Sequence, residues 1–176
     1  MHIYRWSCAN KLKLNPNKSK AIVFSLSYGI RSNLKINNTD IEQVNNIKYL
    51  GLLLQNNLKF DMHIKSIIGK ISRCNGTLFA LRKTFDQKTL RNLYFAFVYS
   101  HLNFHILAWG SSANYLIESL SISQNKAVRN IYGSYRIRQH TSDLYNNNNL
   151  LRFRDLYCLK LSLFMHKLIN YNQGVF

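Results

Sequence analysis

The first 56 residues alternate short apolar runs with clusters of Asn and Asp residues. This pattern is typical of short strands that are joined by turns. Lys18 to Leu26 and Ile47 to Leu54 are the clearest strand candidates, and Asn33 to Asn37 and Ile41 to Val44 are shorter ones. Together they predict a small antiparallel sheet built from hairpins, preceded by the end of a helix at residues 3–12.

The spacing of apolar residues changes after Asn56 and Asn57 from the period of strands to that of helices. We therefore place a domain boundary near residue 60. Apolar side chains then recur at spacings of three, four or seven, which puts them on one face of a long amphipathic helix. They are Ile64, Ile67, Ile68, Ile71, Leu78, Leu81 and Phe85.

Three further helices are predicted in the remainder of the chain. Gln87 to Leu107 is apolar nearly all round, which is typical of a central, buried helix. Asn114 to Tyr132 is amphipathic, residues 134–149 are polar and predict a loop, and apolar positions mark a last helix from Phe153 to before Gly174. The whole pattern predicts an α+β fold, with a small antiparallel β-hairpin sheet in residues 1–60 and a helical bundle in residues 61–176.

The charge of the chain points to a polyanionic partner. Its 176 residues include 24 Lys and Arg but only 7 Asp and Glu, a formal net charge of +17. Such an excess repels itself in a compact state unless an anionic partner relieves it, which favours nucleic acid. AT-rich codons would explain the many Asn residues, but they would supply acidic residues much as they supply Lys. Codon usage therefore does not explain the charge balance.

The three cysteines are far apart and odd in number, which favours an intracellular compartment, nuclear or cytoplasmic, over secretion. The N-terminal segment is too polar for a signal peptide. Leu93 to Trp109 is strongly apolar, but His101, Asn103 and His105 interrupt it, and a membrane span needs about 20 mostly apolar residues. We therefore expect a buried helix there and no membrane partner.

Residue patterns for catalysis are missing from the sequence. The seven acidic residues are dispersed, whereas two-metal phosphoryl transfer requires paired carboxylates. His101 and His105 lie four apart, but Leu102 stands where a zinc-protease helix has Glu, so we interpret both as packed helix histidines. No Gly-rich phosphate loop or activated nucleophile is indicated. The sequence predicts no catalytic residue, no metal site and no small-molecule substrate.

What remains is a basic surface with aromatic residues interleaved. Basic and aromatic side chains together suit phosphate contacts combined with stacking. An ordinary solvated basic face would carry the same residues, but the scarcity of acidic residues favours binding. The densest part lies around one predicted helix end and loop, and comprises Arg129, Tyr132, Tyr135, Arg136, Arg138 and His140.

Short motifs follow one another in an order that resembles the reverse transcriptases of non-LTR retrotransposons of the LINE, jockey-like type. The segment that follows the catalytic carboxylates in that family is resembled by Trp6, Asn10-Lys11-Leu12-Lys13-Leu14-Asn15, Lys18-Ser19-Lys20 and Phe24 of this chain. The primer-grip hairpin of the family is resembled by Lys48-Tyr49-Leu50-Gly51. Its thumb resembles Leu58 and His63, His101-Leu102 with Ile106-Leu107-Ala108-Trp109-Gly110, Gln124-Asn125-Lys126-Ala127-Val128-Arg129, His140-Thr141, Phe153-Arg154-Asp155-Leu156 and Phe164-Met165-His166-Lys167. Each motif is weak alone, while the ordered series is more specific.

The resemblance implies the end of a palm domain followed by a helical thumb, in a family of RNA-directed DNA polymerases. It implies that Tyr49, Leu50 and Gly51 approach the primer end. The residues expected to contact the phosphates of a template–primer duplex of RNA or DNA are Arg73, Arg82, Lys83, Lys126 and Arg129, to which the basic loop adds Arg136 and Arg138.

The chain also departs from the family pattern. The catalytic Tyr-x-Asp-Asp is missing, and Ser100 and His105 replace the usual Pro and Gly. We therefore expect a truncated fragment that binds nucleic acid but is inactive alone, with Mg²⁺ a cofactor only of a full-length relative.

Two alternatives remain open. The chain could be a protein-interaction or scaffold module that docks through the uncharged Leu93 to Trp109 segment. Alternatively, it could lack a stable fold. The sequence leaves the oligomeric state open.

Overall fold

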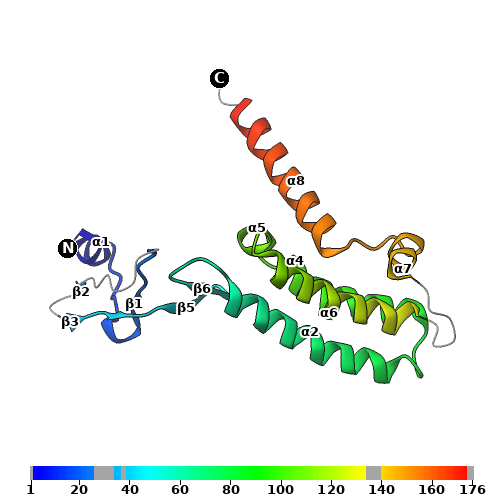
Figure 1. Ribbon diagram of the computed structural model, residues 1–176. Coiled ribbons are helices and arrows are strands. Elements are labelled where there is room, and N and C mark those ends of the chain that lie inside the picture. The colour runs from blue at the N-terminus through cyan, green and yellow to red at the C-terminus, as the bar shows by residue number, and fades with distance from the viewer. Residues whose placement is uncertain (1, 26–33, 37–38, 134–139, 174–176) are drawn as a thin grey trace. The chain divides into compact units, whose positions relative to one another are not determined.

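The computed structural model describes residues 2–25, 34–36, 39–133 and 140–173. The chain divides into two compact units, Met1–Met62 and His63–Phe176. Short strand pairs lie in the first unit and helices fill the second (Figure 1). The predicted α+β class, a small sheet region together with a helical region, is confirmed.

The N-terminal unit begins with helix α1 (His2–Ala9), followed by the single 3₁₀ turn η1 (Pro16–Lys18). Helix α1 ends sooner than residue 12, and Lys11 adopts a positive φ of 55°. The Asn15 side chain accepts a hydrogen bond of 3.1 Å from the backbone N–H of Asn17, and Pro16 occupies the first position of the turn, where its fixed φ is favourable.

Three two-stranded ladders are described in this unit. Two are antiparallel, as predicted: β2 (Lys35–Ile36) with β3 (Thr39–Asp40), and β5 (Asn46–Tyr49) with β6 (Leu52–Gln55). The third is parallel and joins β1 (Lys20–Ala21) to β4 (Glu42–Gln43). The prediction of one long strand from Lys18 is therefore wrong for residues 18–25, because only Lys20 and Ala21 form a strand there. These two residues pair with a segment about twenty residues later and do not form a hairpin with the next strand. Residue 26 lies outside the described residues.

The prediction of one strand from Ile47 to Leu54 is wrong, because the chain turns tightly at Leu50 and Gly51 and forms the β5–β6 hairpin instead. Tyr49 pairs with Leu52, so the loop has two residues, and both have positive φ values, 46° at Leu50 and 86° at Gly51. Two positive φ values are the signature of the turns that suit the twist of a hairpin, and glycine adopts them without strain. Gly51 is thus required by the turn itself.

Helix α2 (Asp61–Leu81) opens the helical unit, and Asp61 lies in its first turn, where the helix dipole favours an anion. Ile64, Ile67, Ile71 and Leu78 are at most 3% exposed, so the predicted apolar face is confirmed. Phe85 was assigned to this face, but it lies beyond the helix end and is exposed.

The predicted single helix from Gln87 to Leu107 is wrong in two respects. It comprises α3 (Gln87–Tyr94), the π-helical turn η2 (Phe95–Tyr99) and α4 (Ser100–Asn103), and it then breaks before α5 (Ile106–Trp109). At the break His105 adopts a left-handed conformation with φ of 49°. The segment is also not buried all round, because Phe97, Phe104 and Leu107 are exposed while Leu90, Tyr94, Val98 and Leu102 form the core face.

The π turn follows from the spacing of this core face. Leu90, Tyr94, Val98 and Leu102 recur every four residues. In a straight α-helix each such step advances about 40° around the axis. A wider turn takes up that drift, and so the four side chains stay in one line.

Helix α6 (Asn114–Tyr132) matches the predicted range and buries Leu116, Leu120, Ala127 and Val128. The loop predicted for residues 134–149 is wrong for residues 141–147, because α7 (Thr141–Asn147) lies there and buries Leu144 and Tyr145. Residues 134–139 lie outside the described residues. Helix α8 (Phe153–Gln173) matches the predicted last helix, and Gly174 lies outside the described residues.

Candidate nucleic-acid interface

One buried glutamine links three helices of the helical unit. Gln124 on α6 is 1% exposed, and its Nε2 donates to the Tyr94 hydroxyl at 2.9 Å and to the Leu151 carbonyl at 3.0 Å. Its Oε1 accepts from the backbone N–H of Phe153 at 3.0 Å. One side chain therefore ties α6 to α3 and to the start of α8.

A second cluster surrounds Trp109, which is fully buried. The Phe153 ring stacks on it with centroids 5.1 Å apart, and the His63 ring meets it edge-on at 5.6 Å. Its indole N–H donates to the Phe104 carbonyl at 2.8 Å, which pairs a backbone group at the break between α4 and α5. At Gly110 a Cβ would lie only 2.6 Å from the Ile106 carbonyl oxygen and would collide with Tyr157.

Burial controls the ionisation of the groups in this region. It lowers the pKa of His63 to about 4, and the charges of Lys70 and His105 lower it further. Burial also lowers the pKa of His101, with a smaller contribution from Lys70. His63 and His101 are thus neutral at pH 7, and His101 is part-buried in α4, which agrees with its interpretation as a packed helix histidine. The same interpretation is wrong for His105, which is exposed at the break between α4 and α5. Among the described residues, no group of three His, Cys, Asp or Glu side chains is placed to hold a metal ion.

A hydrogen-bonded seam of amides joins α2 and α6. Asn75 on α2 donates from Nδ2 to the Ser123 carbonyl at 3.0 Å. Asn130 on α6 donates from Nδ2 to the Asn75 carbonyl, also at 3.0 Å. The seam fixes which faces of the two helices are turned outward.

Four of the predicted phosphate contacts lie near this seam. Lys126 and Arg129 are exposed on α6, one turn and one residue before Asn130 respectively. Arg82 and Lys83 follow the end of α2 and share with Asn130 the lining of a pocket. We call Arg82, Lys83, Lys126 and Arg129 the α2–α6 basic cluster. Arg129 also donates to the Thr141 hydroxyl at 2.7 Å, which links α6 to α7.

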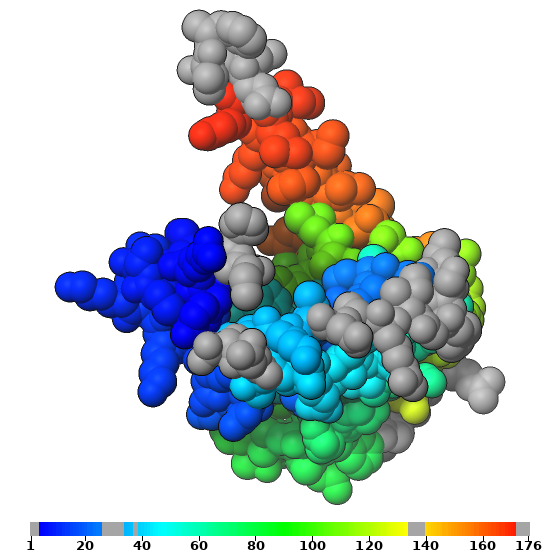
Figure 2. Space-filling model, turned by 90° about the vertical axis from the view of Figure 1, so that its left-hand side faces the viewer, coloured from blue at the N-terminus to red at the C-terminus, as the bar shows by residue number. Residues whose placement is uncertain are grey.

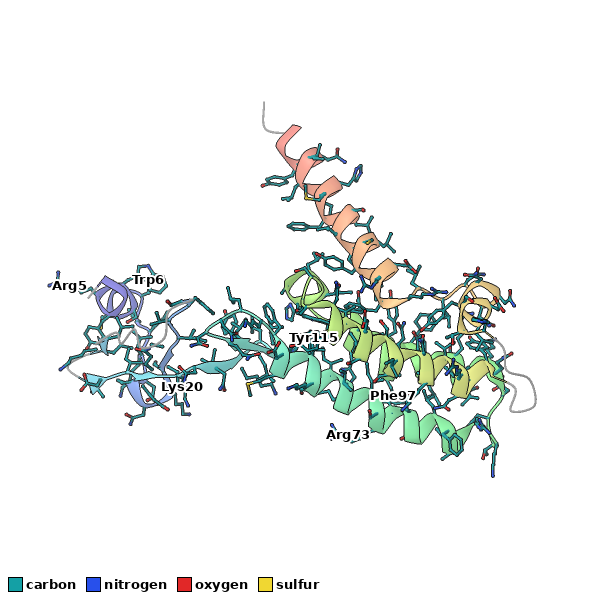
Figure 3. All side chains as sticks on the ribbon, viewed as in Figure 1. Arg5, Trp6, Lys20, Arg73, Phe97 and Tyr115 are labelled. Carbon is teal, nitrogen blue, oxygen red and sulfur yellow. The ribbon has the colours of Figure 1, made fainter. Side chains whose placement is uncertain are left out.

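Arg73 is not brought to this cluster. Asn75 points toward α6, and a residue two positions earlier in an α-helix lies about 200° around the axis. Arg73 therefore lies on the far side of α2, as Figure 3 shows. Arg136 and Arg138 lie outside the described residues, so their placement stays a prediction.

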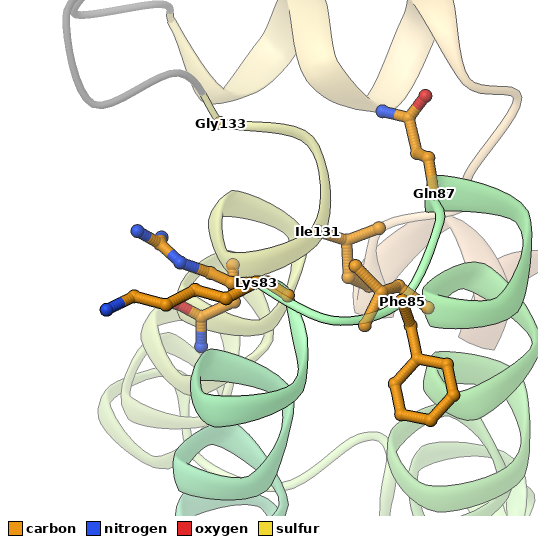
Figure 4. A pocket seen from close by; sticks show the side chains of 8 residues that line it. Lys83, Phe85, Gln87, Ile131 and Gly133 are labelled. Carbon is orange, nitrogen blue, oxygen red and sulfur yellow. The ribbon is translucent and has the colours of Figure 1, made fainter.

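The pocket at the basic cluster has a volume of about 350 Å³. Arg82 and Lys83 supply positive charge, Asn130 and Gln87 supply amides, and Ile131 and Leu90 supply apolar surface. In the view of Figure 4, Lys83 extends to one side of Ile131 and Gln87 lies on the other. Sequence reasoning missed Gln87 and Asn130, because they lie far apart along the chain and only the packing of α6 against the α2–α3 turn joins them.

The primer-grip-like residues belong to the other unit. Tyr49 and Leu50 at the tip of the β5–β6 hairpin are 61% and 70% exposed. A hairpin tip with two exposed apolar side chains and a glycine is open to close approach by a partner.

Comparison with protein-family models, with curated proteins and with solved structures finds no match for this chain. Among the described residues, no helix combines the length and apolar character needed to cross a membrane.

Proposed function

We propose that the helical unit binds a nucleic-acid duplex through its phosphates, as the thumb of a non-LTR reverse transcriptase would. The α2–α6 basic cluster would contact one strand of a template–primer duplex. No catalytic role is proposed for this chain. Tyr49, Leu50 and Gly51 would approach the primer end from the hairpin of the first unit.

The observation that carries the proposal is the unpaired positive charge of the helical unit. Residues 63–176 contain fifteen Lys and Arg but four acidic residues. The ion pairs Lys20–Glu42 and Lys35–Asp40 both lie in the first unit. Apart from Arg82, the Lys and Arg in the described part of the helical unit form no ion pair within the chain. Such charges gain most from an external polyanion.

The packing of the motif residues also supports the proposal. His63, Trp109 and Phe153 come from three separate motifs of the resemblance, and they meet in one cluster. Gln124, from a fourth motif, donates to the carbonyl of Leu151 and accepts from the N–H of Phe153. Motif residues that were matched independently thus form one core, as expected if the series describes a single folded unit.

The test measures binding of a short RNA–DNA hybrid by fluorescence anisotropy at salt concentrations from about 50 to about 200 mM. We expect affinity to fall steeply with salt. Lys126→Ala should reduce the slope of log K against log salt by about 0.9, because each phosphate contact releases about that many counterions. Arg73→Ala, on the far side of α2, should leave the slope nearly unchanged.

Lys167→Ala is the matched control, since it removes the same charge from an exposed position on α8. Binding that is independent of salt, or no binding at low salt, would refute the proposal. Equal slopes for Lys126→Ala and Lys167→Ala would refute the assignment to the α2–α6 basic cluster.

A second candidate function, a protein-interaction module, is favoured by the distal half of α8. Eight apolar side chains between residues 159 and 171 are 38% to 76% exposed: Leu159, Leu161, Leu163, Phe164, Met165, Leu168, Ile169 and Tyr171. In the space-filling view of Figure 2 these last turns of α8 project beyond the other helices of the same unit. Exposed apolar surface of this extent marks interaction sites in soluble proteins.

This candidate differs from the docking face expected at Leu93 to Trp109, where Val98, Leu102 and Trp109 are packed in the core and the exposed large apolar side chains are Phe97, Phe104 and Leu107. It predicts protein partners that remain bound after nuclease treatment and that are lost in Phe164→Glu but retained in Lys167→Ala. Partners that disappear with nuclease would exclude it.

A further inference from the structure

The pocket at the end of α6 has dimensions that a duplex does not fit. Its volume of about 350 Å³ is close to the lower limit of small-molecule sites. A duplex lies along an extended surface and presents its phosphates in rows. An open depression of this size accepts a single small unit instead.

We propose that this pocket binds one unpaired nucleotide, such as the first unpaired residue of a template overhang, with its phosphate at Arg82 and Lys83. The inference rests on the proposed function and names the substrate feature that the same surface would recognise. The pocket is lined at the α2–α3 turn by both cations and by Gln87, and from α6 by Asn130 and Ile131.

The cations of the site are placed for a phosphate. The Arg82 guanidinium lies over the Phe79 ring, 4.6 Å from its centroid, a contact that restricts its orientation. Lys83 is exposed and forms no ion pair among the described residues. A guanidinium and an ammonium on adjacent residues form charge-assisted hydrogen bonds to phosphate oxygens.

The rest of the lining separates a nucleotide from a simple anion. The Phe85 ring, which is 45% exposed and also lines the pocket, provides an aromatic surface for the flat face of a base. The amides of Asn130 and Gln87 can donate to and accept from base edges. Asn130 is held in place because its Nδ2 donates to the Asn75 carbonyl. Inorganic phosphate would use the cations alone and leave this surface uncovered.

Two substitutions test the site without removing core packing. Lys83→Ala deletes one phosphate contact. Gln87→Glu places a negative charge at the pocket, yet Gln87 is exposed and is the first residue of α3, where an acidic side chain stabilises the helix. It should therefore weaken binding without weakening the fold. Lys65→Ala and Ser66→Glu make the same charge changes at exposed positions near the start of α2.

The experiment compares a blunt RNA–DNA hybrid with the same hybrid carrying a short single-stranded overhang, using the whole chain and fluorescence anisotropy. Adenosine 5′-monophosphate and inorganic phosphate are tested in parallel by calorimetry. We expect the overhang to increase affinity, and Lys83→Ala and Gln87→Glu to remove about tenfold of binding to the overhang substrate. The two control variants should weaken both hybrids equally and preserve the preference.

The outcomes separate the two ideas. Salt-dependent binding of the blunt hybrid with no gain from the overhang overturns the pocket assignment and leaves the proposed function standing. Loss of the overhang preference in the control variants, or inorganic phosphate binding as tightly as the nucleotide, also overturns the assignment. If neither hybrid binds while the nucleotide binds the wild type and not Gln87→Glu, the pocket assignment stands and the duplex proposal fails.

Discussion

Replacing Gln124 by Leu keeps a side chain of similar size but removes every hydrogen bond that joins α6 to α3 and α8 at this point. The Tyr94 hydroxyl and the Phe153 N–H each lose a partner in the core. The Leu151 carbonyl also loses one, although Leu151 is 38% exposed and its carbonyl is open to water. The cost therefore comes mainly from the first two groups.

A buried polar group left without a partner costs about 1–3 kcal/mol, so two such groups should lower the free energy of unfolding by about 3 kcal/mol. Tyr94→Phe removes only the hydroxyl and one hydrogen bond, and should cost about 1 kcal/mol. In the double variant the two effects should not add, because both include the same Tyr94–Gln124 bond. Urea-induced unfolding, monitored by circular dichroism, measures the free energy of unfolding of all three variants.

Ser119→Ala serves as the control. Ser119 lies on the exposed face of α6, and its hydroxyl bonds only to the Tyr115 carbonyl within the same helix. The free energy of unfolding of the Ser119→Ala variant should stay within about 0.5 kcal/mol of the wild-type value, as for most surface substitutions. The same small change for Gln124→Leu, or strict additivity in the double variant, would refute the reasoning that Gln124 joins the three helices.

Two further predictions concern the Trp109 cluster and the glycines. Protonation of His63 favours the unfolded state, because its pKa is lowered from 6.5 to about 4 on folding. The contribution of neutral His63 to the free energy of unfolding should thus be complete above pH 6.5 and should fall by up to about 3 kcal/mol as the pH drops toward 4. Urea titrations at several pH values should show a weaker pH dependence for His63→Phe. Gly110→Ala should lower the melting temperature because its Cβ would crowd the Ile106 carbonyl, whereas Gly76→Ala, where a Cβ meets nothing within 4 Å, should raise stability by up to about 1 kcal/mol. A Gly110→Ala protein that melts with the wild type would contradict the close packing of Tyr157.

Local patterns predicted the long helices well. The apolar spacing in α2 and α6 places the same residues inward as the structure does, because a single buried face repeats with the helical period. The segment from Gln87 to Leu107 misled because it carries no Lys, Arg, Asp or Glu after Arg91, and lack of charge is not the same as burial. Phe97, Phe104 and Leu107 are exposed there.

The candidate interface was predicted only in part. Charge and resemblance predict Arg82, Lys83, Lys126 and Arg129 as phosphate contacts, and nothing local distinguishes these residues from Arg73. Gln124 had one available signal, a polar residue on the apolar face formed by Leu120, Ala127 and Ile131. A polar residue at such a position must find buried partners, and that requirement predicts a structural role without identifying the partners.

The sequence by itself determined the surplus of positive charge, the change from strand to helix near residue 60 and the inward faces of the long helices. Each of these depends on composition or on a short periodic pattern. Tertiary structure alone decided that β1 pairs in parallel with β4, that Gln124 joins three elements and that Arg73 lies apart from Lys126. Those outcomes depend on residues far apart in the chain, whose encounter is set by the packing of whole helices and strands.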